Sequence, residues 1–441
     1  MIKILNSKSK KFNRNLDKLL SLRKNKIKLS SVSVTKIIKD VKKNGDKAIL
    51  KYERKFNKNN IISPSPKKIK KSIATLDPKV KKAIDLAYNR IYKFHSLQKF
   101  KNISYVDNLQ NKLEYKYIPL ESVAIYVPGS TASYPSSVLM NAIPAIVAGV
   151  KRIVMINPGY KGKQNPAVLY AAKKCKITEV YQIGGPSAIA GVAYGTKKIK
   201  KVNKIVGPGN VFVSAAKKEI FGEVGIDMIA GPSEITVVAD KFSNVEWVAA
   251  DLLAQAEHDI NSQCILIAKD ENFINKVRNS IFDQLKDLPR KYIANKSLRS
   301  NSILIKSHSN KQIVNIINKI ATEHLELNIK KYQSILNKIN NAGSICLGKY
   351  SAMAVTDYNA GTNHILPTNS SAKFSSGLSV HDFYKRISYI NLSKKGIETL
   401  GPSVITLAKF EGLEGHAKSI KFRLGRNLNC QSKIYSSSKV K

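Results

Sequence analysis

Apolar residues occur in short clusters along the chain, and from about residue 122 onward these clusters alternate with longer segments of helical spacing. Five clusters that end near Gly, Pro or Asp predict β-strands: SVAIYVPGS, KRIVMINPG, EVYQIGGPS, NKIVGPGN and EITVVAD. Between them, SSVLMNAIPAIVAGV and NPAVLYAAKKC predict buried helices. Strands and helices that alternate in this way are typical of a parallel sheet with helices on both faces.

The alternation begins again after Asp240. A helix that reaches His258 is followed by the strand SQCILIAKD, a helix through FINKVRNSIFDQL, the strand NSILIK, a helix through KQIVNIINKIATEHLEL and the strand GSICLG. A Lys-rich helical segment precedes the first alternation, and a tail follows the second. The pattern predicts an α/β fold with two tandem Rossmann-like, doubly wound domains and small helical segments at the N- and C-termini.

Composition agrees with a globular protein of more than one domain. The chain has 441 residues, of which 43% are hydrophobic and 24% are charged. No apolar run approaches the roughly 20 residues of a membrane span. The N-terminal stretch MIKILNSKSKKFNRN lacks the pattern of a secretory signal. We therefore expect no membrane partner and a place in the cytoplasm.

A formal net charge of +45 suggests nucleic-acid binding, because Lys and Arg neutralise phosphates. However, most of the 75 basic residues are Lys, whereas recognition of base edges favours Arg. The Lys residues are also spread along the chain and become fewer near the unusual polar motifs. We therefore predict no specific nucleic-acid partner, and a basic nucleic-acid-binding protein remains the distant alternative.

Four cysteines stand far apart and form no CxxC pair: Cys175, Cys264, Cys346 and Cys430. Two of them lie inside predicted strands. This spacing predicts buried, unreactive thiols and argues against structural disulfides and a cysteine-based zinc site.

Glycine-rich turns follow several predicted strands. Backbone N–H groups at such turns can bind the phosphates of a dinucleotide. The chain has no GxGxxG motif, however, and IGGPSAIAG and VGPGNVFV only approximate it. These glycines could equally form ordinary tight turns between strand and helix.

The segment ADLLAQAEHD has Gln255 and His258 three residues apart, on one face of a predicted helix end. The pair could be a polar helix terminus or half of a metal site. Three further motifs, ATEHLEL, TDYNAGTNHILPT and FEGLEGHAKSI, contain candidate partners: Glu323 and His324, expected inside a helix; Asp357, Gly361 and His364 in a loop; and Glu411 and His416 in the tail. A mixed set of nitrogen and oxygen ligands without thiolate suits a catalytic zinc ion.

Five motifs in this order resemble the histidinol dehydrogenase family: DMIAGPSEITVVAD, DLLAQAEHD, TEHLEL, DYNAGTNHILPT and EGLEGHAKSI. The resemblance extends from about residue 20 to residue 430. It implies an enzyme with zinc and NAD as cofactors. Such an enzyme oxidises L-histidinol to L-histidine through an enzyme-held aldehyde, with two NAD⁺, in the last step of histidine biosynthesis. A related dehydrogenase of the same fold that acts on another alcohol is the nearer alternative.

The resemblance also implies roles for individual residues. It gives as zinc ligands Gln255, His258, Asp357 and His416. It gives as catalytic residues Glu323, which activates water, and His324, which takes the alcohol proton. The substrate contacts are the zinc ligands and His324 together with Ser233, His364 and Glu411, and the cofactor contacts are Tyr126, Ser187 and Asn210.

The domain organisation that the resemblance implies has four parts. Residues 1–21 form an N-terminal helical segment, and residues 22–125 with 233–378 form a first α/β domain that holds the metal and catalytic residues. Residues 126–232 form a second, NAD-binding α/β domain. Residues 379–441 form a tail that packs on the partner subunit of a homodimer, so that each active site is shared.

The chain departs from the family pattern at a few positions. Pro186 and Ser187 stand in IGGPS. Many members of the family have Gln at the position of Ser187, where it contacts the cofactor. Met353 and Thr356 replace a common Glu and Gly, and Ser130 replaces the last Gly of the VPGG turn. None of these positions is a zinc ligand or a member of the Glu–His pair.

Overall fold

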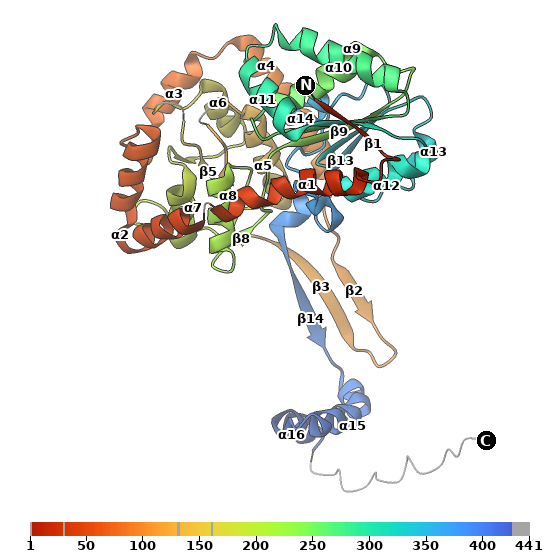
Figure 1. Ribbon diagram of the computed structural model, residues 1–441. Helices are drawn as coiled ribbons and strands as arrows, with labels where there is room; N and C mark the ends of the chain where they lie inside the picture. The colour runs from red at the N-terminus through yellow and green to blue at the C-terminus, as the bar shows by residue number, and fades with distance from the viewer. Residues whose placement is uncertain (1, 30, 130–132, 160–161, 426–441) are drawn as a thin grey trace, which may run out of the picture. The chain divides into compact units, whose positions relative to one another are not determined.

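The computed structural model describes residues 2–29, 31–129, 133–159 and 162–425 (Figure 1). Ser130 and Cys430 lie outside the described residues. The chain divides into two compact units, the larger made of residues 1–99 and 120–383 and the smaller of residues 100–119 and 384–441. The larger unit contains two parallel sheets, as the alternation of strands and helices predicts.

The first sheet of the larger unit has six parallel strands in the order β1-β11-β10-β9-β12-β13. In that order its strands are Lys3–Asn6, Ile303–Lys306, Gln263–Ala268, Glu234–Ala239, His324–Asn328 and Ser344–Leu347.

Alternate residues of the central strand β9 point to opposite faces of this sheet. Ile235 and Val237 pack with α9 (Val245–Ala256), α10 (Glu271–Leu285) and α11 (Lys291–Asn301). Val238 packs on the other face with α12 (Asn310–Ile320) and α13 (Gln333–Leu336). Helices therefore cover both faces, as Figure 1 shows for α9 and α12.

The second sheet of the larger unit has five parallel strands in the order β6-β5-β4-β7-β8. In that order they are Glu179–Tyr181, Arg152–Ile156, Ser122–Tyr126, Lys204–Val206 and Gly225–Ile226. From β4 the chain first adds β5 and β6 on one side, and then returns to add β7 and β8 on the other side, so the strand order reverses between β4 and β7. In open α/β sheets, such a reversal marks the crevice where ligands bind.

Helices α2 (Ser31–Asn57), α7 (Gly185–Tyr194) and α8 (Val211–Ile220) share a buried apolar cluster with this second sheet. Four other helices pack among themselves: α3 (Pro66–Ala74), α4 (Pro78–Ser96), α5 (Pro135–Ala148) and α6 (Pro166–Lys174). Helix α5 also packs against β4 and β5. The larger unit also contains α1 (Phe12–Leu29), α14 (Met353–Tyr358) and two 3₁₀ helices, Ser371–Lys373 and Val380–Phe383.

The smaller unit is an antiparallel sheet with two helices. Its strand order is β14-β3-β2, with bounds Tyr384–Asn391, Lys112–Pro119 and Ile103–Val106. Helices α15 (Lys394–Phe410) and α16 (Glu414–Arg423) pack against each other.

The structure corrects several predicted boundaries. Residues 3–6, expected in a helical segment, form β1 because Ile4 and Leu5 complete the edge of the first sheet beside β11. Helix α2, expected in the first α/β domain, packs on the second sheet, and β4 of that sheet begins at Ser122, before residue 126. Residues 100–119, also expected in the first domain, belong to the smaller unit, where β3 pairs with the tail strand β14.

The prediction of a helix through Glu323 and His324 is also wrong. Helix α12 ends at Ile320, because its C-cap residue Ala321 has the left-handed φ of 48°. His324–Asn328 then forms the buried strand β12, and its residues alternate between polar and apolar. That period of two is a strand signal that the sequence interpretation overlooked.

No helix among the described residues is long and apolar enough to cross a membrane.

Candidate active site

The polar residues from four separate motifs meet at the amino ends of the strands of the first sheet. His324 is the first residue of β12, Glu323 precedes it directly, and Ser233 lies just before β9. Gln255 belongs to the last turn of α9, and Asp357 belongs to α14. These short elements bring residues more than 100 positions apart in the sequence into one buried region.

Gln255 and His258 form the first part of this region. The Gln255 side chain is fully buried, and its Nε2 lies 3.4 Å from Nδ1 of His258. The amide oxygen Oε1 of Gln255 has no hydrogen-bond partner among the described residues. Burial, together with the positive charge of Arg290, lowers the pKa of His258, so its ring is neutral and keeps a nitrogen lone pair.

Glu323, His324 and Asp357 form the second part. Nε2 of His324 lies 3.9 Å from Oε1 of Glu323 and 3.7 Å from Oδ1 of Asp357. Burial, with smaller contributions from His364 and His258, lowers the pKa of His324 to about 3. Burial raises the pKa of Asp357 to about 7. The imidazole of His324 is therefore a neutral base in a region of low polarity.

Backbone contacts hold Glu323 in place. Its Oε2 accepts a hydrogen bond of 2.7 Å from the backbone N–H of Glu234, and its carbonyl accepts one of 2.9 Å from Ser344. A Cβ atom on Gly343 would come within 2.6 Å of the Glu323 carbonyl oxygen. Only glycine fits this approach, so Gly343 and Glu234 support the site, although neither stood out in the sequence.

His364 lies beside Asp357. Its Nδ1 donates a hydrogen bond of 2.7 Å to the backbone carbonyl of Asp357, and its Nε2 lies 3.5 Å from Oγ of Ser137. Burial lowers the pKa of His364 to about 4. The ring is thus neutral, with Nε2 as its acceptor nitrogen.

Glu411 and His416 are the two predicted site residues in the smaller unit. Glu411 caps the C-terminus of α15, and His416 lies in α16. Both side chains are exposed in the single chain.

The donors of the larger unit fit a zinc ion. The unpartnered Gln255 oxygen, the neutral His258 ring and the Asp357 carboxyl group are all zinc donors. Among the described residues, no cluster of three or more His, Cys, Asp and Glu side chains could hold a metal by itself.

The three predicted cofactor residues lie at the carboxyl ends of the second sheet or in the helices that follow. Tyr126 is buried at the end of β4, and its hydroxyl accepts a hydrogen bond of 3.1 Å from the Gly185 backbone. Ser187 is buried in α7 and donates to the Gly184 carbonyl. Asn210 caps α8 and is exposed. The glycine-rich turns therefore do have the strand-to-helix placement that dinucleotide binding requires.

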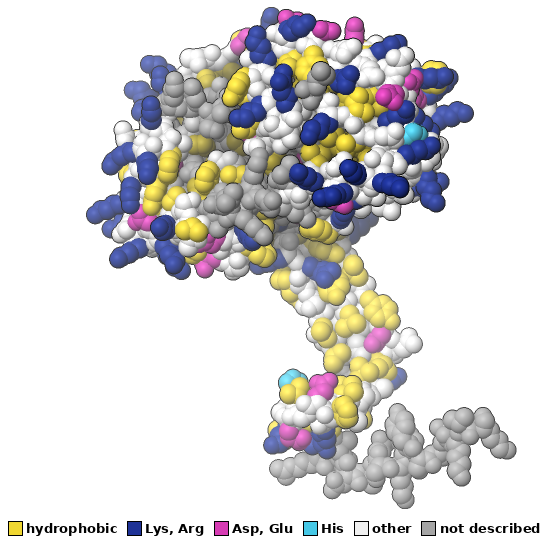
Figure 2. All heavy atoms as spheres, viewed as in Figure 1, with side chains coloured by type: hydrophobic (Ala, Val, Ile, Leu, Met, Phe, Trp, Pro, Cys, Tyr) yellow, Lys and Arg dark blue, Asp and Glu magenta, His cyan; other side chains and the backbone are white. Residues whose placement is uncertain are grey.

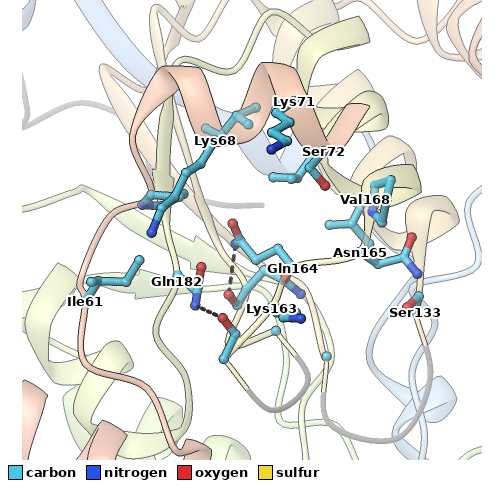
Figure 3. Close-up of a pocket in the computed structure, with 18 of the residues that line it drawn as sticks. Ile61, Lys68, Lys71, Ser72, Ser133, Lys163, Gln164, Asn165, Val168 and Gln182 are labelled. Carbon is cyan, nitrogen blue, oxygen red and sulfur yellow. Dashed lines mark hydrogen bonds between the residues drawn. The ribbon is translucent and has the colours of Figure 1, made fainter. Parts of the chain in front are cut away.

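A cavity of about 1410 Å³ opens at the same edge of the second sheet (Figure 3). Pro128, Asn157 and Gln182, which line it, follow β4, β5 and β6. Helix α3 contributes Lys68 and Lys71, and the described residues that line the cavity include no Asp or Glu. Its wall is held by hydrogen bonds from Gln182 to the Gly162 carbonyl and from Gln164 to the Asn157 carbonyl. The cavity suits an anionic ligand.

Comparison with known proteins identifies the family. A family model described as histidinol dehydrogenase matches residues 21–424. The chain is 74% identical to a histidinol dehydrogenase of Pelagibacter ubique over 97% of this chain and 100% of that protein. It is 46% identical to one of Mesorhizobium japonicum over 89% and 92% of the two chains.

A solved structure agrees with these matches. The crystal structure of histidinol dehydrogenase from Elizabethkingia anophelis superposes with a TM-score of 0.88 at 36% identity, covering 96% of this chain and 98% of that one. The chain therefore belongs to the histidinol dehydrogenase family, a family of zinc- and NAD-dependent oxidoreductases.

Proposed function

We propose that this chain oxidises L-histidinol to L-histidine through histidinaldehyde with two NAD⁺, the final step of histidine biosynthesis. The observation that carries the proposal is the group formed by Glu323, His324 and Asp357, in which a neutral imidazole lies within 4 Å of two carboxyl groups. An alcohol dehydrogenation needs a base at the hydroxyl group, and the second oxidation needs an activated water.

Gln255, His258 and Asp357 would hold the zinc ion together with a His416 side chain. The support is the buried Gln255 oxygen, which has no hydrogen-bond partner within the part of the chain that the structure describes, and the neutral ring of His258. Zinc, when bound, supplies a Lewis-acidic anchor for the imidazole and amino nitrogens of histidinol.

His324 would take the hydroxyl proton of histidinol, and NAD⁺, when bound, would accept the hydride from the carbinol carbon. The low pKa of His324 keeps the ring deprotonated before the reaction. Glu323 then removes a proton from the water that adds to the aldehyde, which gives the gem-diol for the second hydride transfer. The hydrogen bond from the Glu234 N–H fixes one Glu323 oxygen and leaves the other on the side of His324.

His364, Ser233 and Glu411 complete the substrate site in this proposal. The acceptor nitrogen of His364 can bind an ammonium group, and a carboxylate such as Glu411 can bind a cationic substrate. For the cofactor, Tyr126, Ser187 and Asn210 mark the turns that the dinucleotide crosses. The Lys-lined cavity beyond them has the charge and size for its phosphates.

A homodimer with shared active sites is the proposed assembly. The smaller unit exposes large apolar side chains along its sheet and on its helices, including Tyr105, Ile390, Leu407 and Phe410. Figure 2 shows hydrophobic side chains covering much of the visible face of this sheet. Apolar surface of this extent is typical of an interface between subunits, and an exposed His416 is then available to a second copy. The location of the protein in the cytoplasm stays a prediction.

Turnover of histidinol compared with simple diols tests the proposed substrate. We expect histidinol oxidation alone to be efficient, because only histidinol offers both nitrogens to the metal. Equal rates with simple diols would instead support a related alcohol dehydrogenase.

Lys and Arg are scattered over the visible face of the larger unit (Figure 2), so we expect any retention on a polyanion to disappear at moderate salt.

A further inference from the structure

Glu326 is a buried carboxyl group that the proposed chemistry does not use. Its side chain is only 3% exposed. It lies two residues after His324 on β12, so both side chains project from the same face of the strand. Leu325 and Leu327 face the opposite side, where they pack with α12. Glu326 therefore faces the side of the sheet that α9 covers.

Two hydrogen bonds tie Glu326 to neighbouring helices. Its Oε1 accepts a hydrogen bond of 2.6 Å from the backbone N–H of Met353, the first residue of α14. Its side chain also shares a hydrogen bond with the carboxyl group of Asp251 in α9. Two carboxyl groups can form a hydrogen bond only when one of them carries a proton. Burial and the nearby Asp251 raise the pKa of Glu326 to about 9, which keeps that proton bound at neutral pH.

Each helical partner of Glu326 lies about one helical turn from a residue of the proposed active site. Asp251 precedes Gln255 by four residues on one face of α9. Met353 precedes Asp357 by four residues in α14. The contacts of Glu326 thus join the three elements that carry Gln255, His324 and Asp357.

We propose that the Glu326–Asp251 pair positions the zinc site by fixing α9, β12 and α14 relative to one another. The pair touches neither substrate nor metal in this proposal. It acts through its hydrogen bonds, which set the spacing of the Gln255 and Asp357 ligands. The pair itself carries at most one negative charge. This inference rests on the proposed function, because it assumes that these ligands bind zinc.

Zinc affinity of matched variants, measured by competition with a chromophoric chelator, tests the inference without an activity assay. In Glu326→Gln, the amide oxygen still accepts from Met353 and the NH₂ group still donates to Asp251. We therefore expect zinc affinity within about threefold of the wild type. Glu326→Leu removes both hydrogen bonds and is expected to weaken zinc binding by roughly 10- to 100-fold. The control Leu304→Ala, in the buried strand β11, should lower Tm without changing zinc affinity.

Two results would overturn the inference. Wild-type zinc affinity in Glu326→Leu would mean that the pair does not position the ligands. An equal loss in Glu326→Gln and Glu326→Leu would mean that Glu326 is ionised and that its charge, not the hydrogen bonds, matters. If Glu326→Leu does not fold, Asp251→Leu at its partly exposed helical position removes only the hydrogen bond between the two carboxyl groups, and wild-type zinc affinity in that variant would also overturn the inference. A wild-type protein that fails to bind zinc would instead contradict the proposed function.

Discussion

Nε2 of His324 lies 3.7 Å from Oδ1 of Asp357, although the two residues belong to different elements, β12 and α14. The proposed general base is therefore adjacent to a proposed zinc ligand. His324 is buried and Asp357 is only slightly exposed, and burial keeps the His324 ring neutral. Proton removal and metal binding consequently share one small region of low polarity, where electrostatic interactions are strong.

Replacing His324 should slow both oxidation steps. His324→Asn removes the base, and general-base catalysis typically contributes about 10² to 10⁴ in rate. We expect kcat to fall by that order with histidinol and with histidinaldehyde, whereas bound zinc stays near one ion per chain. Steady-state kinetics and metal analysis of the same preparation measure both quantities. Loss of zinc in parallel with activity would show that His324 acts mainly as a ligand.

Replacing Glu323 should separate the two steps. Glu323→Gln keeps an acceptor for the Glu234 N–H but cannot take a proton from water. We expect aldehyde oxidation to be impaired more than alcohol oxidation, with histidinaldehyde trapped on the enzyme. Single-turnover measurements that start from the alcohol and from the aldehyde distinguish the steps. Similar losses in both would contradict the assignment of water activation to Glu323.

His258→Asn should reduce zinc content and turnover together. The substitution removes a proposed ligand nitrogen from a position beside the Gln255 amide. His308→Asn is the matched control, because His308 contacts Asn6 far from these residues in the sequence and has no proposed ligand role. Metal analysis after dialysis should show less zinc only in the first variant. Equal zinc in both proteins would remove His258 from the ligand set.

Mixing two inactive variants tests the shared site. In a heterodimer of one His258→Asn chain and one His416→Asn chain, one site combines both lesions. If His416 reaches across to the partner, the other site has neither lesion. Unfolding and refolding the two variants together should therefore restore part of the activity. A mixture that stays inactive would indicate that each tail serves its own chain.

The buried cysteines should not take part in the reaction. Burial raises the pKa of Cys175, Cys264 and Cys346 to about 12, so almost no thiolate exists at pH 8 and alkylation should begin only at much higher pH. In a Cys430→Ser background, treatment with iodoacetamide at pH 8 should leave activity unchanged. Rapid inactivation would point to a reactive thiol near the site.

The parallel sheets were predictable because their strands are short apolar clusters separated by turns and helices. The antiparallel sheet of the smaller unit was not, because β2, β3 and β14 contain no buried residue and lack a continuous apolar pattern. Strand β1 was missed for a related reason. It is a four-residue edge strand whose pairing with β11 depends on residues 300 positions away.

The candidate site was predicted only in part. Spacing along α9 indicated Gln255 with His258, but no local pattern could bring them near Asp357, since that approach depends on the order of strands in the first sheet. The resemblance to a family supplied the full set of residues. The supporting contacts of Glu234, Gly343 and Glu326 depend on the register of neighbouring strands, and these residues looked ordinary in the sequence.

The yield of NADH per histidinol consumed, with and without a chelator, tests the central claim most directly. A zinc-dependent oxidation of the alcohol to the acid predicts two NADH for each histidinol. It also predicts no NADH after the metal is removed, and full recovery when Zn²⁺ is restored. One NADH per histidinol with release of the aldehyde, or an undiminished yield from the metal-free protein, would contradict the account.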